Sequence, residues 1–177
     1  MSWEGGVDLV ALTGAATAPN IIVHLARMVH TPQGSAPSGM VLYQPDPEAA
    51  PAVIGFVSHD SKVGGYFGPN IFADTPFEKA PVLSSVIEIE SDFPRKVTSR
   101  VKVAEHLLEV EMFNFQEMTL IHRAPAAMPP FWQQGVEAIP ERVTLKVNGE
   151  EVPLTLPPVG ISGGHPVVWS PHGIYAR

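Results

Sequence analysis

The chain of 177 residues contains no cysteine, so disulfides, thiolate nucleophiles and cysteine-ligated zinc are excluded together. Basic residues are also scarce: 11 Lys and Arg stand against 18 Asp and Glu, which gives a formal net charge of −7. Because duplex binding depends on clustered Lys and Arg that meet phosphates, nucleic acid is not an expected partner. An anionic membrane surface is disfavoured for the same reason.

Long hydrophobic runs are missing as well. No stretch approaches the roughly 18 apolar residues that a membrane-spanning helix needs. The first nineteen residues lack a basic segment and carry Glu4 and Asp8, so they do not resemble a secretion signal. We therefore expect a cytoplasmic protein without a membrane partner. Hydrophobic residues still make up 45% of the chain, which is enough for one core, and we expect a single domain over residues 1–177.

The 19 prolines lie mainly in clusters between short apolar runs. Proline interrupts both helices and sheet ladders, so these clusters indicate turns between short strands. Many short strands separated at regular intervals by turns predict a mainly β protein, an antiparallel β-barrel or closed β-sandwich with little helix.

The segment Ser84–Phe115 shows the clearest strand pattern, with three runs of alternating apolar and polar residues. Asn148-Gly149 between two further runs predicts a two-residue hairpin turn. Residues 20–30 fit either a helix or a strand, and we favour the strand. The segment Gly64–Thr75 has three glycines but no phosphate-loop motif, so we expect tight turns that position aromatic side chains.

Two of the alternating runs place carboxylates opposite apolar residues. Glu88 and Glu90 share one face, as do Glu109 and Glu111. We favour a solvated face with cross-strand ion pairs, and the alternative is a polar barrel interior with carboxylates that carry out acid–base chemistry.

Seven histidines are the main candidates for chemistry, because imidazole titrates near neutral pH and ligates metals. None has the spacing of a metal site, since neither HxH nor HExxH occurs. We therefore expect no metal and no cofactor, although separate strands can still assemble a site. The residues His59 and Asp60 follow a predicted strand, where they form either a proton-transfer cluster or a polar turn.

The C-terminal part is dense in functional residue types: His165, Trp169, His172 and Tyr175 lie within eleven residues. This density indicates the mouth of a pocket, and the alternative is a last strand that closes the sheet. The residues predicted to act as acids or bases are His59, Asp60, His122 and His172. The residues predicted to bind the substrate are Tyr66, Lys96, Arg123, Trp132, His165 and Trp169, with Lys96 and Arg123 available for an anionic group.

The sequence from Phe93 to Val97, FPRKV, resembles the aromatic-Pro-Lys-Lys-Leu segment at the start of a strand in acetoacetate decarboxylases. In that family the first lysine forms a Schiff base with a β-keto acid, and the adjacent cation lowers its pKa. Here Arg95 stands at that position and cannot form an imine, while Lys96 matches the supporting lysine. The similarity covers five residues and assigns the chain to no family.

The residues together favour a cofactor-independent enzyme with a pocket in the β structure. It would act on a small, largely apolar molecule, with or without a carboxylate, by proton transfer, as an isomerase, lyase, cyclase or decarboxylase. One alternative is a non-catalytic small-molecule-binding protein or an accessory subunit of a larger complex. Another is a cupin-like metal-dependent enzyme. Edge strands such as 152–156 are compatible with a homo-oligomer or a hetero-complex.

Overall fold

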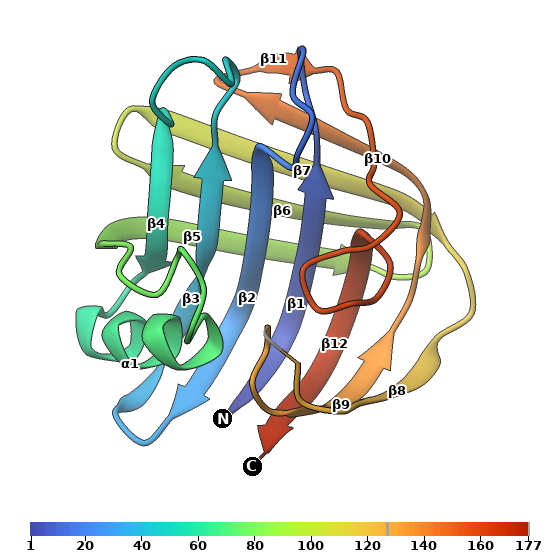
Figure 1. Cartoon of the computed structure of the whole chain (residues 1–177). Coiled ribbons are helices and arrows are strands. Elements are labelled where there is room, and N and C mark those ends of the chain that lie inside the picture. Colours follow the sequence, from blue (N-terminus) through green and yellow to red (C-terminus); the bar gives the residue numbers. More distant parts are fainter. Residues whose placement is uncertain (127, 177) are drawn as a thin grey trace.

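The computed structural model describes residues 1–126 and 128–176, and in this part of the chain it is mainly β with a single helix (Figure 1). The elements are β1 (Ser2–Ala11), β2 (Ile21–Thr31), β3 (Gly34–Tyr43), β4 (Val53–Ser58), α1 (Ser61–Ile71), β5 (Val82–Asp92), β6 (Lys96–Val103), β7 (His106–Phe115), β8 (Thr119–Arg123), β9 (Trp132–Glu137), β10 (Pro140–Val147), β11 (Glu150–Val152) and β12 (Val167–Ala176). The predicted mainly β class with little helix is confirmed.

The strands form one sheet in the order β11-β10-β7-β6-β5-β4-β3-β2-β1-β12-β9-β8. Strand β5 connects its two halves: Val82–Ser84 pair in parallel with β4, whereas Ser85–Asp92 pair in antiparallel with β6. The half that contains β6, β7 and β10 lies behind the half that contains β1 to β4 and crosses it steeply (Figure 1). The sheet is nevertheless open, because β8 and β11 are its two ends and are not paired with each other. The predicted closure is therefore absent.

The main core fills the space between the two halves. Alternate residues of β1 and β2, such as Val7 and Leu25, are at most 1% exposed and meet Leu108 and Met112 of β7 in one apolar cluster. Each such side chain contributes about 1.5–3 kcal/mol relative to leaving it in water. The three strands expected within Ser84–Phe115 are confirmed, and so is the strand expected over residues 20–30.

A second apolar cluster lies on the opposite, outer face of the first half, beneath α1. Its members include Met40 and Phe56 from the sheet and Phe67 and Phe72 from the helical segment. The helix begins after Asp60, whose carboxylate accepts hydrogen bonds from the backbone N–H groups of Lys62 and Val63 at 2.8 and 3.1 Å. It forms the connection between the parallel strands β4 and β5.

This helix corrects the expectation of tight turns over Gly64–Thr75. Gly68 allows close packing instead, since a Cβ atom there would lie 2.3 Å from the Phe56 ring. Strand β9 begins at Trp132, and β12 extends to Ala176. No helix in the described part of the chain is long and apolar enough to cross a membrane.

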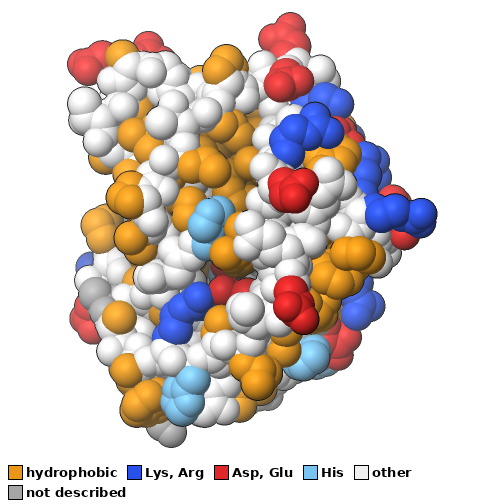
Figure 2. Space-filling model, turned by 90° about the vertical axis from the view of Figure 1, so that its right-hand side faces the viewer, with side chains coloured by type: hydrophobic (Ala, Val, Ile, Leu, Met, Phe, Trp, Pro, Cys, Tyr) orange, Lys and Arg blue, Asp and Glu red, His pale blue; other side chains and the backbone are white. Residues whose placement is uncertain are grey.

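The Asn148-Gly149 turn between β10 and β11 is confirmed, with φ values of 52° and 87°. The polar face of β5, β6 and β7 is exposed to solvent and carries cross-strand ion pairs, as favoured from the sequence. Arg100 donates to Glu109 at 2.5 Å, and Lys96 pairs with Glu111. Charged side chains of both signs gather along the right-hand side of Figure 2, where this half of the sheet lies.

Neighbouring leucines on β7 test the register of this strand. Leu108 is 1% exposed and Leu107 is 40% exposed. We expect Leu108→Ala to lower the free energy of unfolding by about 2–5 kcal/mol, because it opens a cavity in the core. The matched control Leu107→Ala should change it by less than about 0.5 kcal/mol. Urea denaturation measures both, and equal effects would contradict the register.

Candidate functional site

Two charged residues face each other at the centre of the outer face. Asp8 on β1 and His24 on β2 are directly opposite in the antiparallel ladder, and their side chains lie on the face away from the main core. Asp8 Oδ1 is hydrogen-bonded to His24 Nδ1. The two side chains are only 15% and 16% exposed. The imidazole is stacked on the Phe67 ring of α1, with 5.9 Å between ring centroids and an interplanar angle of 4°.

The pKa of His24 reflects this environment. Burial by itself lowers the pKa, because it penalises the charged imidazolium, but the negative charge of Asp8 and the hydrogen bond to it outweigh burial. The net effect raises the pKa of His24 above its usual value of 6.5. The same hydrogen bond fixes the ring orientation, so that Nε2 is the nitrogen available for chemistry.

A second ion pair lies nearby on β8 and β9. Arg123 donates two hydrogen bonds to Glu137, both of 2.7 Å, and Glu137 is 5% exposed. The same guanidinium donates to Gln133 Oε1 at 3.2 Å. Since arginine has only donors, this bond leaves the Gln133 amide nitrogen as the free end of the side chain. Arg123 therefore neutralises a buried carboxylate and also orients an amide.

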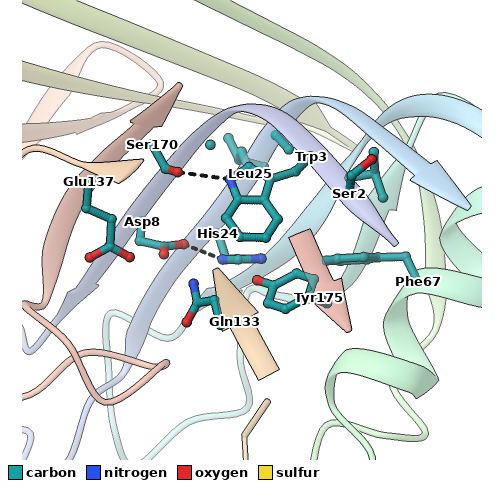
Figure 3. Close-up of a pocket in the computed structure, with 13 residues that line it drawn as sticks. Ser2, Trp3, Asp8, His24, Leu25, Phe67, Gln133, Glu137, Ser170 and Tyr175 are labelled. Carbon is teal, nitrogen blue, oxygen red and sulfur yellow. Dashed lines mark hydrogen bonds and ion pairs between the residues drawn. The ribbon is translucent and has the colours of Figure 1, made fainter. Parts of the chain in front are cut away.

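These groups surround an enclosed cavity of about 20 Å³. Asp8, His24, Gln133, Glu137 and Tyr175 line it from four different strands, and Figure 3 shows them converging on one space. The other walls are largely aromatic and aliphatic, formed by Trp3, Leu25, Ala26, Val29 and Phe67. The volume is that of roughly one water molecule, or of one carbonyl oxygen.

Two of the aromatic walls are held by specific contacts. Trp3 Nε1 donates to Ser170 Oγ at 3.0 Å, which fixes the indole. The Tyr175 ring lies 4.6 Å from the Trp3 ring between centroids. Burial, together with the charges of Asp8 and Glu137, raises the pKa of Tyr175 far above its usual value. The phenol therefore stays protonated and acts as a hydrogen-bond donor.

Three polar atoms at this cavity make no hydrogen bond to any other described residue: His24 Nε2, Gln133 Nε2 and Tyr175 Oη. Gln133 is 3% exposed and Tyr175 is 9% exposed. These atoms belong to residues that line one small space, so two donors and one imidazole nitrogen are available there to a bound group that carries an acceptor oxygen.

The structure places the predicted residues His59 and Asp60 elsewhere. His59 is exposed after β4, where its Nε2 accepts a hydrogen bond from the Ile87 N–H at 2.7 Å. Asp60 caps α1. Both side chains thus have structural partners, and their role in catalysis stays a prediction.

Other predicted residues meet at a second, open hollow. His122 and His172 line a groove of about 670 Å³, together with Glu4 and His30, which are 3.1 Å apart. Trp132 lies beside His122, with 5.1 Å between ring centroids. The groove therefore brings two of the predicted residues together, His122 and His172, with Trp132 next to one of them.

The remaining predicted residues are dispersed. Arg123 lies beside the enclosed cavity, and Tyr66 lines a further surface pocket of about 280 Å³. Trp169 is 5% exposed and belongs to the main core, while His165 is exposed in the loop before β12. Lys96 lies in the other half of the sheet, paired with Glu111.

Sequence reasoning missed the central pair, although a signal for it exists. Asp8 and His24 interrupt the apolar runs at residues 7–11 and 21–26. A lone polar residue in such a run is forced into a buried environment, where it needs a partner. In the described part of the chain, no group of three or more His, Asp or Glu residues is placed to hold a metal ion.

Substitution of Asp8 tests the electrostatics of the pair. In Asp8→Asn the raising effect of the charge is lost and burial remains, so the pKa of His24 should fall below its wild-type value. An NMR titration of the imidazole C–H resonances measures this. Glu48→Gln, which removes an exposed carboxylate in a loop, is the control and should leave the titration of His24 unchanged.

The raised pKa also has a consequence for stability. Protonated His24 stabilises the folded state fully below the unfolded-state pKa, about 6.5, and this contribution is lost as the pH rises through the higher folded-state pKa. The difference in unfolding free energy between wild type and Asp8→Asn should therefore become smaller as the pH rises from about 6.5 through the folded-state pKa of His24. A difference that grows with pH in this window would contradict the assignment.

A scan against protein-family models finds no family that matches the chain, and searches of curated proteins and of solved structures find no significant match.

Proposed function

We propose that the protein is a cofactor-independent enzyme that removes a proton from the carbon next to a carbonyl group of a small, uncharged molecule. The observation that carries this proposal is the convergence of one imidazole nitrogen and two hydrogen-bond donors, all without protein partners, on a single enclosed cavity.

His24 is the general base in this proposal. Its Nδ1 is held by Asp8, which fixes the ring and stabilises the imidazolium once it forms. Nε2 takes the proton: the C–H bond breaks, an N–H bond forms, and the electron pair moves onto the carbonyl oxygen as an enolate. Return of the proton to a different carbon gives an isomerisation, and loss of a group from the neighbouring carbon gives an elimination.

Tyr175 and Gln133 stabilise the enolate oxygen. They are opposite each other in the β9–β12 ladder, so their side chains lie next to one another. A phenol that stays protonated and an amide N–H group are both donors, and donors positioned before the reaction stabilise charge where it develops. A low-polarity cavity strengthens this effect.

The charges favour an uncharged substrate. Arg123, which the sequence predicts as an anchor for an anionic group, already has both of its terminal nitrogens bonded to Glu137. Asp8 and Glu137 would repel a carboxylate in the cavity. An isomerase or lyase acting on a neutral carbonyl compound therefore fits this site better than a decarboxylase.

Deuterium exchange of acetone tests the proposal directly. In D₂O, wild-type protein should accelerate loss of the methyl proton signal above the buffer rate, as measured by ¹H NMR. His24→Gln should lower the catalysed rate by about 100-fold or more, the usual contribution of a general base. His59→Gln is the matched control and should retain the rate. If His59→Gln lost the catalysed exchange rate while His24→Gln retained it, the chemistry would instead take place at the end of β4.

Tyr175→Phe tests the oxyanion donor. The variant keeps the ring and its contact with Trp3 but removes the hydroxyl group. We expect kcat for exchange to fall by about 100-fold, with a small change in KM, because the lost hydrogen bond strengthens in the transition state. An unchanged kcat would remove Tyr175 from the mechanism.

The open groove supports a second candidate, the binding of a ligand without catalysis at His30, His122 and His172. Its volume of about 670 Å³ lies in the range of small-molecule sites. Exchange that depended on His122 and not on His24 would move the catalytic site to this groove.

A further inference from the structure

We propose that the substrate is an aryl or similarly flat, conjugated carbonyl compound that occupies two spaces. Its carbonyl group enters the enclosed cavity, and its ring lies in the surface pocket lined by Met1, Tyr66, Asn70, Phe131 and Tyr175, here called the outer pocket. The carbonyl part of this inference rests on the proposed function, whereas the ring part rests on the outer pocket alone.

The two spaces share one wall. Tyr175 lines both the enclosed cavity and the outer pocket, so the two spaces adjoin at this one side chain. Helix α1 contributes to both as well, since Phe67 faces the cavity and its neighbour Tyr66 faces the outer pocket. A ligand that extends along Tyr175 therefore reaches from solvent to His24.

The volumes of the cavity and the outer pocket determine which part of the ligand each can hold. The cavity of about 20 Å³ accepts an oxygen atom but no ring. The outer pocket has about 280 Å³, and an apolar cavity of roughly 150 Å³ already holds benzene. A single ring with one short substituent fits the outer pocket, and the carbonyl next to the ring is then the part that reaches inward.

The lining chemistry selects an apolar, flat group. Three of the five side chains are aromatic, and none is acidic or basic. Aromatic side chains pack well against a planar ring, either offset-stacked or edge-on. Met1 adds a flexible thioether, which contacts aromatic rings favourably. The α-ammonium group of Met1 is the charged group at this pocket, and it donates to the Tyr175 carbonyl oxygen at 3.2 Å.

The test compares acetophenone, which carries a ring, with acetone, which does not. Each exchange rate is divided by its uncatalysed rate in the same D₂O buffer. Wild-type protein should give a kcat/KM for acetophenone at least about tenfold above that for acetone on this scale. Tyr66→Ala should raise KM for acetophenone about fivefold or more, leave its kcat nearly unchanged, and leave acetone unaffected.

Lys62→Ala, an exposed substitution on the same helix, is the control for a general disturbance of α1. If Tyr66→Ala does not fold, Tyr66→Leu removes the ring while keeping an apolar side chain. Saturation-transfer NMR with acetophenone measures binding independently of turnover.

The outcomes separate the two proposals. Exchange of both ketones with no effect of Tyr66 overturns the outer pocket and leaves the proposed function standing. Binding of acetophenone that depends on Tyr66, without exchange of either ketone, supports the outer pocket and overturns the proposed function. Absence of both binding and exchange overturns both.

Discussion

Burial of β1 and β2 on both faces is the constraint on which the candidate site depends. One face meets the other half of the folded sheet, and the opposite face meets α1 and the aromatic side chains around it. At the positions of Asp8 and His24 a charged side chain has little access to bulk water, so it needs a partner within the protein. Asp8 and His24 supply each other with that partner, because the register of the two strands places them directly opposite.

The same constraint explains why the polar groups occur as matched charges. The pair Asp8–His24 and the pair Arg123–Glu137 each combine one acidic and one basic side chain in a largely buried environment. Buried ion pairs contribute little net stability, since desolvation offsets their attraction, yet removal of one partner is costly. The role of these ion pairs here is to orient neighbouring side chains. Asp8 orients an imidazole, and Arg123 orients the Gln133 amide toward the cavity.

The sequence was sufficient for the class of the fold and for most of its strands. Alternation over Ser84–Phe115 and the Asn148-Gly149 turn both reflect local rules, and both are confirmed. The helix α1 was missed because its glycines suggest turns, whereas Gly68 serves contact with Phe56, a residue distant in the sequence. The open sheet was equally hidden, since closure depends on whether the end strands β8 and β11 pair with each other, which the order of the whole sheet decides.

The candidate site was harder to predict than the fold, for a physical reason. Its members come from β1, β2, β9 and β12, and only the sheet order brings them together. Histidines near turns, such as His59, attract attention because loops carry many functional residues. His24 lies instead within an apolar run, where its neighbours Val23 and Leu25 are almost fully buried. Its significance appears only once the opposite strand is known to carry Asp8.

Trp3 connects the enclosed cavity to the open groove, because it lines both. Its indole lies against β12 at a place where a side chain cannot be accommodated: a Cβ atom on Gly173 would lie 2.1 Å from the indole ring. The position of Trp3 therefore depends on a glycine in the groove wall, while the ring itself contacts Tyr175 and is hydrogen-bonded to Ser170. Because one side chain forms part of both spaces, a ligand in the groove that displaced the indole would also change the cavity beside His24. The two hollows thus share part of their wall, formed by Ser2 and Trp3.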